Sequence, residues 1–130
     1  MRVERSKTGK PTITESGGGS SNTGGATIVC GPNGERVKPL FIPRGYCNGD
    51  HAIFVAKPGM CIVSASHDRR GESVTVSKIV AIVGENLELE TIGEWEDGDG
   101  TIPPQFNDAQ EAALSKAHAY HCRSAFYIAN

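Results

Sequence analysis

The stretch that decides the fold is SVTVSKIVAIVGENLELETI, residues 73–92. Apolar side chains recur there at alternate positions, namely Val74, Val76, Val80 and Ile82. Successive side chains of a strand point to opposite faces, so this spacing predicts one buried face. After a turn at residues 84–86, Leu87 and Leu89 alternate with glutamates in the same way. The stretch therefore predicts two antiparallel strands, Ser73–Val83 and Leu87–Ile92.

Shorter apolar runs precede this stretch and are separated by turn residues. Asn33-Gly34 supplies the positive φ angles that a tight hairpin needs. Pro39 predicts an edge position for its run because proline lacks a backbone N–H. The other predicted strands are Ala26–Cys30, Val37–Ile42, His51–Ala56 and Met60–Ser66. About six short strands at this spacing predict a mainly β domain, either a small antiparallel barrel or a sandwich.

One helix is predicted near the C-terminus, after an acidic loop at Gly93–Pro104. Asp108 with Glu111 resembles a capping box, and no Gly or Pro interrupts residues 107–126. The predicted apolar stripe consists of Ala109, Ala113, Leu114, Ala117 and Tyr120. We expect this stripe to cover the end of Ser73–Val83, which is apolar on both faces.

Residues 1–25 differ in composition from the rest of the chain. Glu15–Gly25 reads ESGGGSSNTGG, with five Gly and three Ser in eleven residues. This segment has little apolar area to bury, and glycine loses the most backbone entropy on ordering. We therefore expect a disordered, basic, Gly/Ser-rich N-terminal arm at 1–25, followed by a single domain at 26–130.

The overall charge and hydropathy exclude some function classes. The chain has 130 residues and a net charge of −2, which argues against wholesale capture of nucleic acid or anionic membranes. No apolar run approaches the roughly 18–20 residues that cross a bilayer, and none follows the basic N-terminus as in a secretory signal. We expect a cytoplasmic protein without a membrane partner or a cofactor, with its four cysteines as thiols.

Charge is segregated along the chain. No Lys or Arg occurs between Lys78 and Lys116, whereas nine acidic residues do. Residues 26–83 carry seven basic and four acidic side chains. This asymmetry predicts a protein partner or self-association, head to tail, with a basic surface on an acidic one.

A basic patch is the candidate site for nucleic acid. Arginine suits bidentate phosphate contacts, and two arginines are adjacent in the polar turn after Met60–Ser66. The candidate residues are Arg36, Lys38, Arg44, Arg69 and Arg70. Nucleic-acid-binding barrels also need exposed aromatic rings, and the predicted strands offer only Phe41 and Phe54.

Three further patterns suggest metal or thiol chemistry. Asp97–Ile102, DGDGTI, resembles the middle of an EF-hand calcium loop, but Trp95 and Phe106 occupy its first and last ligand positions. His118, His121 and Cys122 share a helix face and suit zinc, with a fourth ligand from Cys30, Cys47, Cys61, His51 or His67. Cys47 and His51, with Asp50 or Asp68, contain the groups of a thiol hydrolase.

The sequence is most consistent with a non-catalytic binding or assembly module. Small β domains with mobile N-terminal arms recur among virion and other assembly proteins, which is an analogy of fold only. A nucleic-acid-binding small β-barrel centred on Arg69 and Arg70 is the first alternative. A small thiol- or metal-dependent hydrolase is the second.

Overall fold

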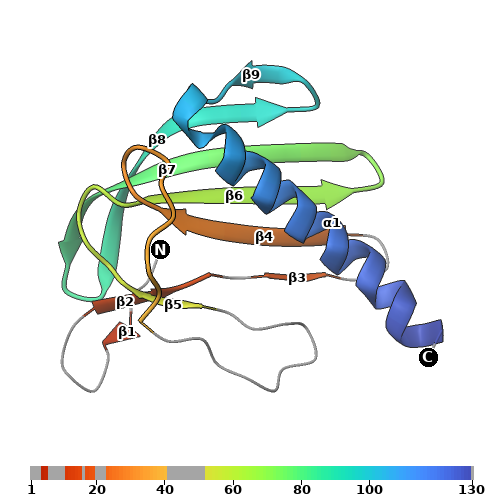
Figure 1. Cartoon of the computed structure of the whole chain (residues 1–130), viewed down its shortest axis with the longest axis horizontal. Coiled ribbons are helices and arrows are strands. Elements are labelled where there is room, and N and C mark those ends of the chain that lie inside the picture. Colours follow the sequence, from red (N-terminus) through yellow and green to blue (C-terminus); the bar gives the residue numbers. More distant parts are fainter. Residues whose placement is uncertain (1–3, 6–10, 16, 20–22, 41–51, 130) are drawn as a thin grey trace.

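The computed structural model describes residues 4–5, 11–15, 17–19, 23–40 and 52–129, and the side chains of the helix as far as His118. It contains a six-stranded sheet, a three-stranded sheet and a C-terminal helix (Figure 1). The predicted mainly β fold with one C-terminal helix is confirmed. Between the two predicted architectures, the described residues form a sandwich-like stack rather than a closed barrel.

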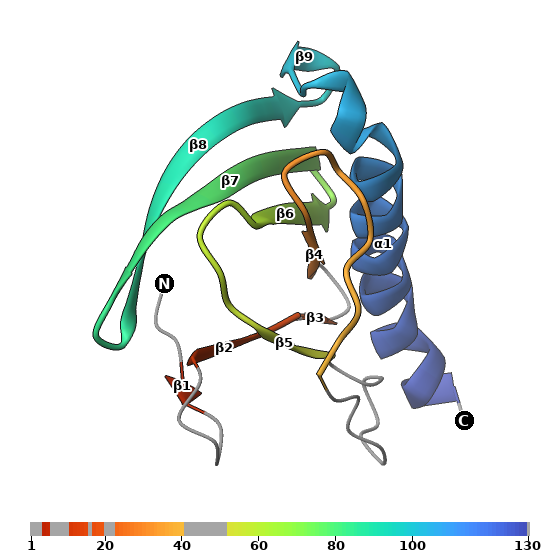
Figure 2. The ribbon, with the colours of Figure 1, turned by 60° about the vertical axis from the view of Figure 1, so that its left-hand side comes forward.

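The large sheet is antiparallel throughout, with strand order β3-β4-β6-β7-β8-β9. Its strands are β3 Gly17–Gly19, β4 Thr23–Cys30, β6 Cys61–Asp68, β7 Gly71–Val83, β8 Asn86–Glu96 and β9 Asp99–Thr101. The small sheet has the order β1-β2-β5, with β1 Glu4–Arg5, β2 Pro11–Thr14 and β5 Ile53–Val55. The large sheet curves, and the small sheet faces its concave side (Figure 2).

The helix α1, Asn107–Ala129, packs across β4 and β6 of the large sheet. Ala109, Ala113 and Ala117 are buried, as the predicted stripe requires, and their small side chains let the helix approach the sheet closely. The buried core on this side also holds Ile28 and Val63. The glycines of β3 and β4 add no side chains under the helix.

The second core lies between the two sheets. Neighbouring residues of one strand serve the two cores, since Ile28 and Cys30 face the helix and Val29 faces the small sheet. The core between the sheets consists of Ile13, Val29, Phe54, Ala56, Met60, Ile62, Ile79 and Leu87. The neighbouring strands β4 and β6 are therefore buried on both faces, which explains their nearly continuous apolar runs.

The face predicted for β7 is correct only for its first half. Val74 and Val76 lie in the core under the helix, whereas Val80 is exposed and Ile82 packs between the sheets. Register shifts between Val76 and Ser77, and between Ile79 and Ala81, change the alternation. The helix accordingly covers β4, β6 and the start of β7, not the doubly apolar end of β7 that the sequence indicates.

Described residues of the predicted N-terminal arm lie in strands. β2 pairs with β5, β3 pairs with β4, and β4 itself begins at Thr23. Ile13 and Glu15 are buried. The Gly/Ser-rich composition predicts flexibility because it offers few side chains to bury. Glycine in a strand nevertheless forms the full backbone hydrogen-bond ladder.

Two local predictions differ from the structure. Val37–Leu40 is not a strand, although the preceding Arg36 bridges to Cys30; Phe41 and Ile42 lie outside the described residues. The predicted acidic loop is a hairpin, because β8 continues to Glu96 and β9 returns at Asp99.

The helix also begins differently from the prediction. A 3₁₀ turn at Pro104–Phe106, which begins with Pro104, leads directly into α1. Asn107 is therefore already helical, and Asp108 lies inside the first turn of α1.

Candidate functional site

A groove of about 730 Å³ opens between segment 31–40 and the turn at residues 57–60. Its apolar lining includes Val37, Leu40 and Phe54, and it reaches the core between the sheets because Phe54 belongs to that core. Lys38 and Lys57 are exposed and line the same groove. This lysine-rimmed groove has the volume and apolar lining of a binding site.

The end of the β7–β8 ribbon forms a second candidate surface, the distal hairpin, residues 80–90. β7 pairs with β6 only as far as Lys78, so beyond Ile79 the ribbon has two strands, and Figure 2 shows it extending past β6. Val80, Val83 and Leu89 are 52%, 56% and 39% exposed. They are three of the four exposed large hydrophobic residues in the described part of the chain; the fourth is Leu40.

The distal hairpin is also acidic. Glu85, Glu88 and Glu90 are all exposed. β9 covers β8 only at Glu94–Glu96, so the described residues leave the outer edge of β8 unpaired from Asn86 to Gly93. Exposed apolar side chains beside charged ones on an open strand edge are typical of an interaction surface.

A buried ion cluster joins four parts of the fold. Glu15 is 5% exposed, and its carboxylate accepts a 2.9 Å hydrogen bond from the backbone N–H of Val29. The same carboxylate lies 3.4 Å from Arg36 and 3.8 Å from Lys116. Burial lowers the pKa of Lys116, and the Glu15 carboxylate opposes that shift. The cluster ties the end of β2 to β4, to segment 31–40 and to α1, which is a structural role.

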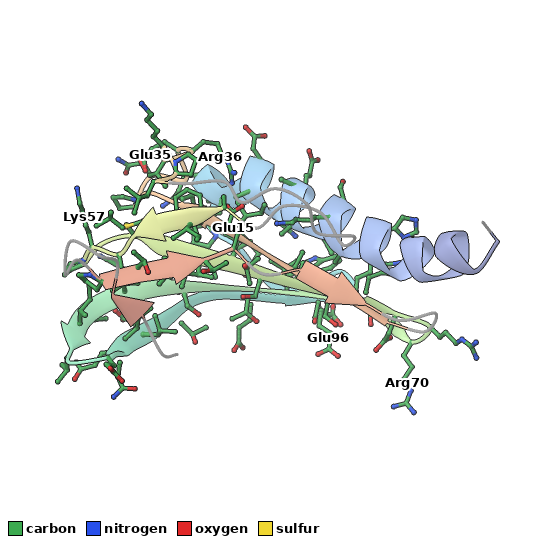
Figure 3. All side chains as sticks on the ribbon, turned by 90° about the horizontal axis from the view of Figure 1, so that it is seen from below. Glu15, Glu35, Arg36, Lys57, Arg70 and Glu96 are labelled. Atoms are coloured by element: carbon green, nitrogen blue, oxygen red, sulfur yellow. The ribbon has the colours of Figure 1, made fainter. Side chains whose placement is uncertain are left out.

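The predicted basic patch is divided in the structure. Arg36 forms a β-bridge with Cys30, and Cys30 pairs with Cys61 at the start of β6. Arg69 and Arg70 follow the other end of β6. Eight residues of strand separate the two ends by about 23 Å. Figure 3 likewise shows Arg36 and Arg70 toward opposite ends.

The members of that patch have different surroundings. Lys38 lines the groove near Arg36, which pairs with Glu15, and Arg44 lies outside the described residues. Phe54, a predicted stacking ring, is 1% exposed, while Phe41 lies outside the described residues.

The EF-hand-like segment forms the β8–β9 turn. The Asp97 carboxylate accepts a 2.7 Å hydrogen bond from the backbone N–H of Glu72, and the Asp97 N–H donates to the Glu72 carbonyl. Asp97 thus holds the β6–β7 and β8–β9 turns together. The described residues contain no group of three or more His, Cys, Asp or Glu that could hold a metal ion.

The structure brings together two histidines from the predicted zinc set. Nδ1 of His118 lies 3.2 Å from Nε2 of His67, with the rings edge to face at a centroid distance of 4.6 Å. His67 comes from β6 and His118 from α1. The side chains of His121 and Cys122 lie outside the described residues.

The described cysteines are unsuited to nucleophilic chemistry. Cys30 and Cys61 are fully buried free thiols opposite each other on β4 and β6. Burial is the main cause that raises the pKa of Cys30 to about 12, and the neighbouring Cys61 is the second. Little thiolate therefore forms near neutral pH.

The groups predicted for a thiol hydrolase are not assembled in the described residues. Cys47, Asp50 and His51 lie outside them. Asp68 accepts hydrogen bonds from the backbone of Arg70 and Gly71 within its turn.

Sequence reasoning missed the Glu15–Lys116 contact and the groove. Both depend on contacts between distant segments, and neither leaves a local pattern. No stretch of the sequence by itself indicates either of them.

Comparisons with known proteins add no family. No protein-family description, curated protein or solved structure matches this chain. Within the described residues, no helix combines the length and apolar character needed to cross a membrane.

Proposed function

We propose that this chain is a non-catalytic assembly module that associates head to tail with further copies of itself. The distal hairpin of one copy would dock into the lysine-rimmed groove of the next. The observation that carries the proposal is the complementarity of these two surfaces, which are both partly apolar and carry opposite charges.

Charge favours this pairing over a symmetric one. The distal hairpin has Glu85, Glu88 and Glu90, whereas the groove has two lysines, Lys38 and Lys57, and one acidic residue, Glu35. Two copies meeting hairpin to hairpin would place glutamates against glutamates, which is repulsive. A contact between different surfaces on each copy can repeat, so it gives a ring or a filament rather than a closed dimer.

Apolar contact supplies the attraction that charge alone does not. Val80 and Val83 are more than half exposed on the hairpin, and Leu40 is 54% exposed beside the groove. Burying such side chains removes apolar area from water at roughly 25 cal/mol per Å². The lysines and glutamates would then set the orientation and the rate of association.

Light scattering of the full chain tests the proposal. From micromolar to near-millimolar concentration at low salt, we expect the mass to rise above 13.8 kDa to multiples of that value. The mass should fall as salt is added, because salt screens exposed charges. A mass of 13.8 kDa over the whole range would contradict self-assembly, as would association that salt does not weaken.

A further inference from the structure

We propose that His67 and His118 together bind one divalent transition-metal ion of the class Zn²⁺, Ni²⁺ or Cu²⁺. The ion would join α1 to β6. The proposal rests on the placement of two imidazole nitrogens from different elements, 51 residues apart in the chain, within 3.2 Å of each other. It does not depend on the proposed assembly.

The spacing of the two nitrogens matches that of metal ligands. Imidazole nitrogens lie about 2.0–2.1 Å from zinc, so two of them at a tetrahedral angle are about 3.3 Å apart. The observed 3.2 Å between Nδ1 of His118 and Nε2 of His67 is close to that separation. The rings now share a hydrogen bond, in which one of the two facing nitrogens carries the proton. When an ion binds, that proton would move to the other nitrogen of the same ring, so that both facing nitrogens present a lone pair.

The remaining coordination positions would be filled by water. His118 is exposed and His67 half-buried, so solvent reaches the pair. The neighbouring Asp68 carboxylate is engaged with backbone N–H groups of its own turn. Two imidazoles with open positions favour Cu²⁺ over Ni²⁺ and Zn²⁺ by the usual order of stability.

This site differs from the one that the sequence indicates. The sequence indicates His118, His121 and Cys122 at positions i, i+3 and i+4 of the helix, with His67 as only one of several candidates for a fourth ligand. The pair with His67 instead connects the helix to the sheet. Variants at His67 and Cys122 therefore separate the two sites.

The test is calorimetric titration of the full chain with Ni²⁺, which should show one ion per chain. His67→Ala and His118→Ala should each weaken binding more than about tenfold, since even groups that only orient a ligand contribute about that much. His121→Ala and Cys122→Ser, the matched controls, should bind within about twofold of wild type. Ni²⁺ should raise the Tm of wild type and of both controls, but not of His67→Ala.

Three results would overturn the proposal. Wild type could bind no ion, His67→Ala could bind as tightly as wild type, or Cys122→Ser could lose binding as His118→Ala does. The last result would assign the ion to the helix alone. Circular dichroism of His67→Ala confirms that a loss of binding does not come from unfolding.

Discussion

Glu15 shows how one residue can change the interpretation of a segment. It begins the Gly/Ser-rich stretch that the sequence suggests is flexible, yet its carboxylate is buried against Arg36, Lys116 and the N–H of Val29. A buried carboxylate is tolerated only where charges and donors compensate it. In this structure the Glu15 carboxylate is therefore compensated by two cations and a backbone donor.

Glu15→Gln tests this role. The amide oxygen can still accept from Val29, but the charge opposite Lys116 is lost, so we expect a loss of about 1–3 kcal/mol in the free energy of unfolding. Urea denaturation measures it. Lys116→Met in the Glu15→Gln background should recover part of the loss, because no ammonium is then left buried without its carboxylate. A stability equal to that of wild type would mean that residue 15 lies outside the fold.

Cys30 predicts a dependence of stability on alkaline pH. Its thiol titrates at about 12 in the folded chain and at 9.0 when unperturbed. Between these values the folded state binds more protons than the unfolded state, so stability is retained below pH 9.0 and falls as the pH rises toward 12.

The comparison with Cys30→Ala isolates this thiol. Wild type should be the more stable below pH 9, and its advantage should shrink by up to about 1 kcal/mol per pH unit above that value. Titrating groups that do not interact with Cys30 act on both proteins alike and cancel. An advantage that stays constant from pH 7 to pH 11 would show that the thiol is not desolvated in the fold.

At the scale of elements, the helix is held by an alanine face. Ala113 is fully buried against the large sheet, whereas its neighbour Ala112 is exposed. Ala113→Leu should cost about 1–3 kcal/mol of stability, because the added atoms must fit between helix and sheet. Ala112→Leu, the matched control, should stay within about 0.5 kcal/mol of wild type. Equal effects in thermal unfolding would contradict this packing.

The helix and most large-sheet strands could be predicted from the sequence because their signals are local. Apolar runs between turn residues locate β4 and β6, alternation locates β8, and the spacing of Ala109, Ala113 and Ala117 predicts the buried helix face. The register shifts in β7 leave no such signal, so Val80 and Ile82 were placed on the wrong face. β2 leaves no local signal because its partner β5 lies far along the chain, and β3 leaves none because it consists only of glycine.

The candidate site was less predictable for the same reason. Sequence identified the charge asymmetry and included both His67 and His118 among the zinc ligands, but grouped Arg36 with Arg69 and Arg70. Arg36 lies near one end of β6 and Arg69 and Arg70 follow the other end, so the length of this strand keeps them apart. A patch is a property of the folded surface, and composition along the chain describes it poorly.

At the scale of the whole molecule, the two opposed surfaces make a sharp prediction for mixed variants. Glu88→Gln with Glu90→Gln weakens the distal hairpin and leaves the groove intact. Lys38→Gln with Lys57→Gln weakens the groove and leaves the hairpin intact. Each variant alone has one competent surface, so we expect each to remain at 13.8 kDa where wild type assembles.

The most direct test is the mass of an equimolar mixture of these two variants, measured by light scattering under conditions where wild type assembles. One intact hairpin can then meet one intact groove, so we expect a species of twice 13.8 kDa and nothing larger. A mixture that stays at 13.8 kDa, or a single variant that assembles as wild type does, would contradict head-to-tail docking of the distal hairpin into the lysine-rimmed groove.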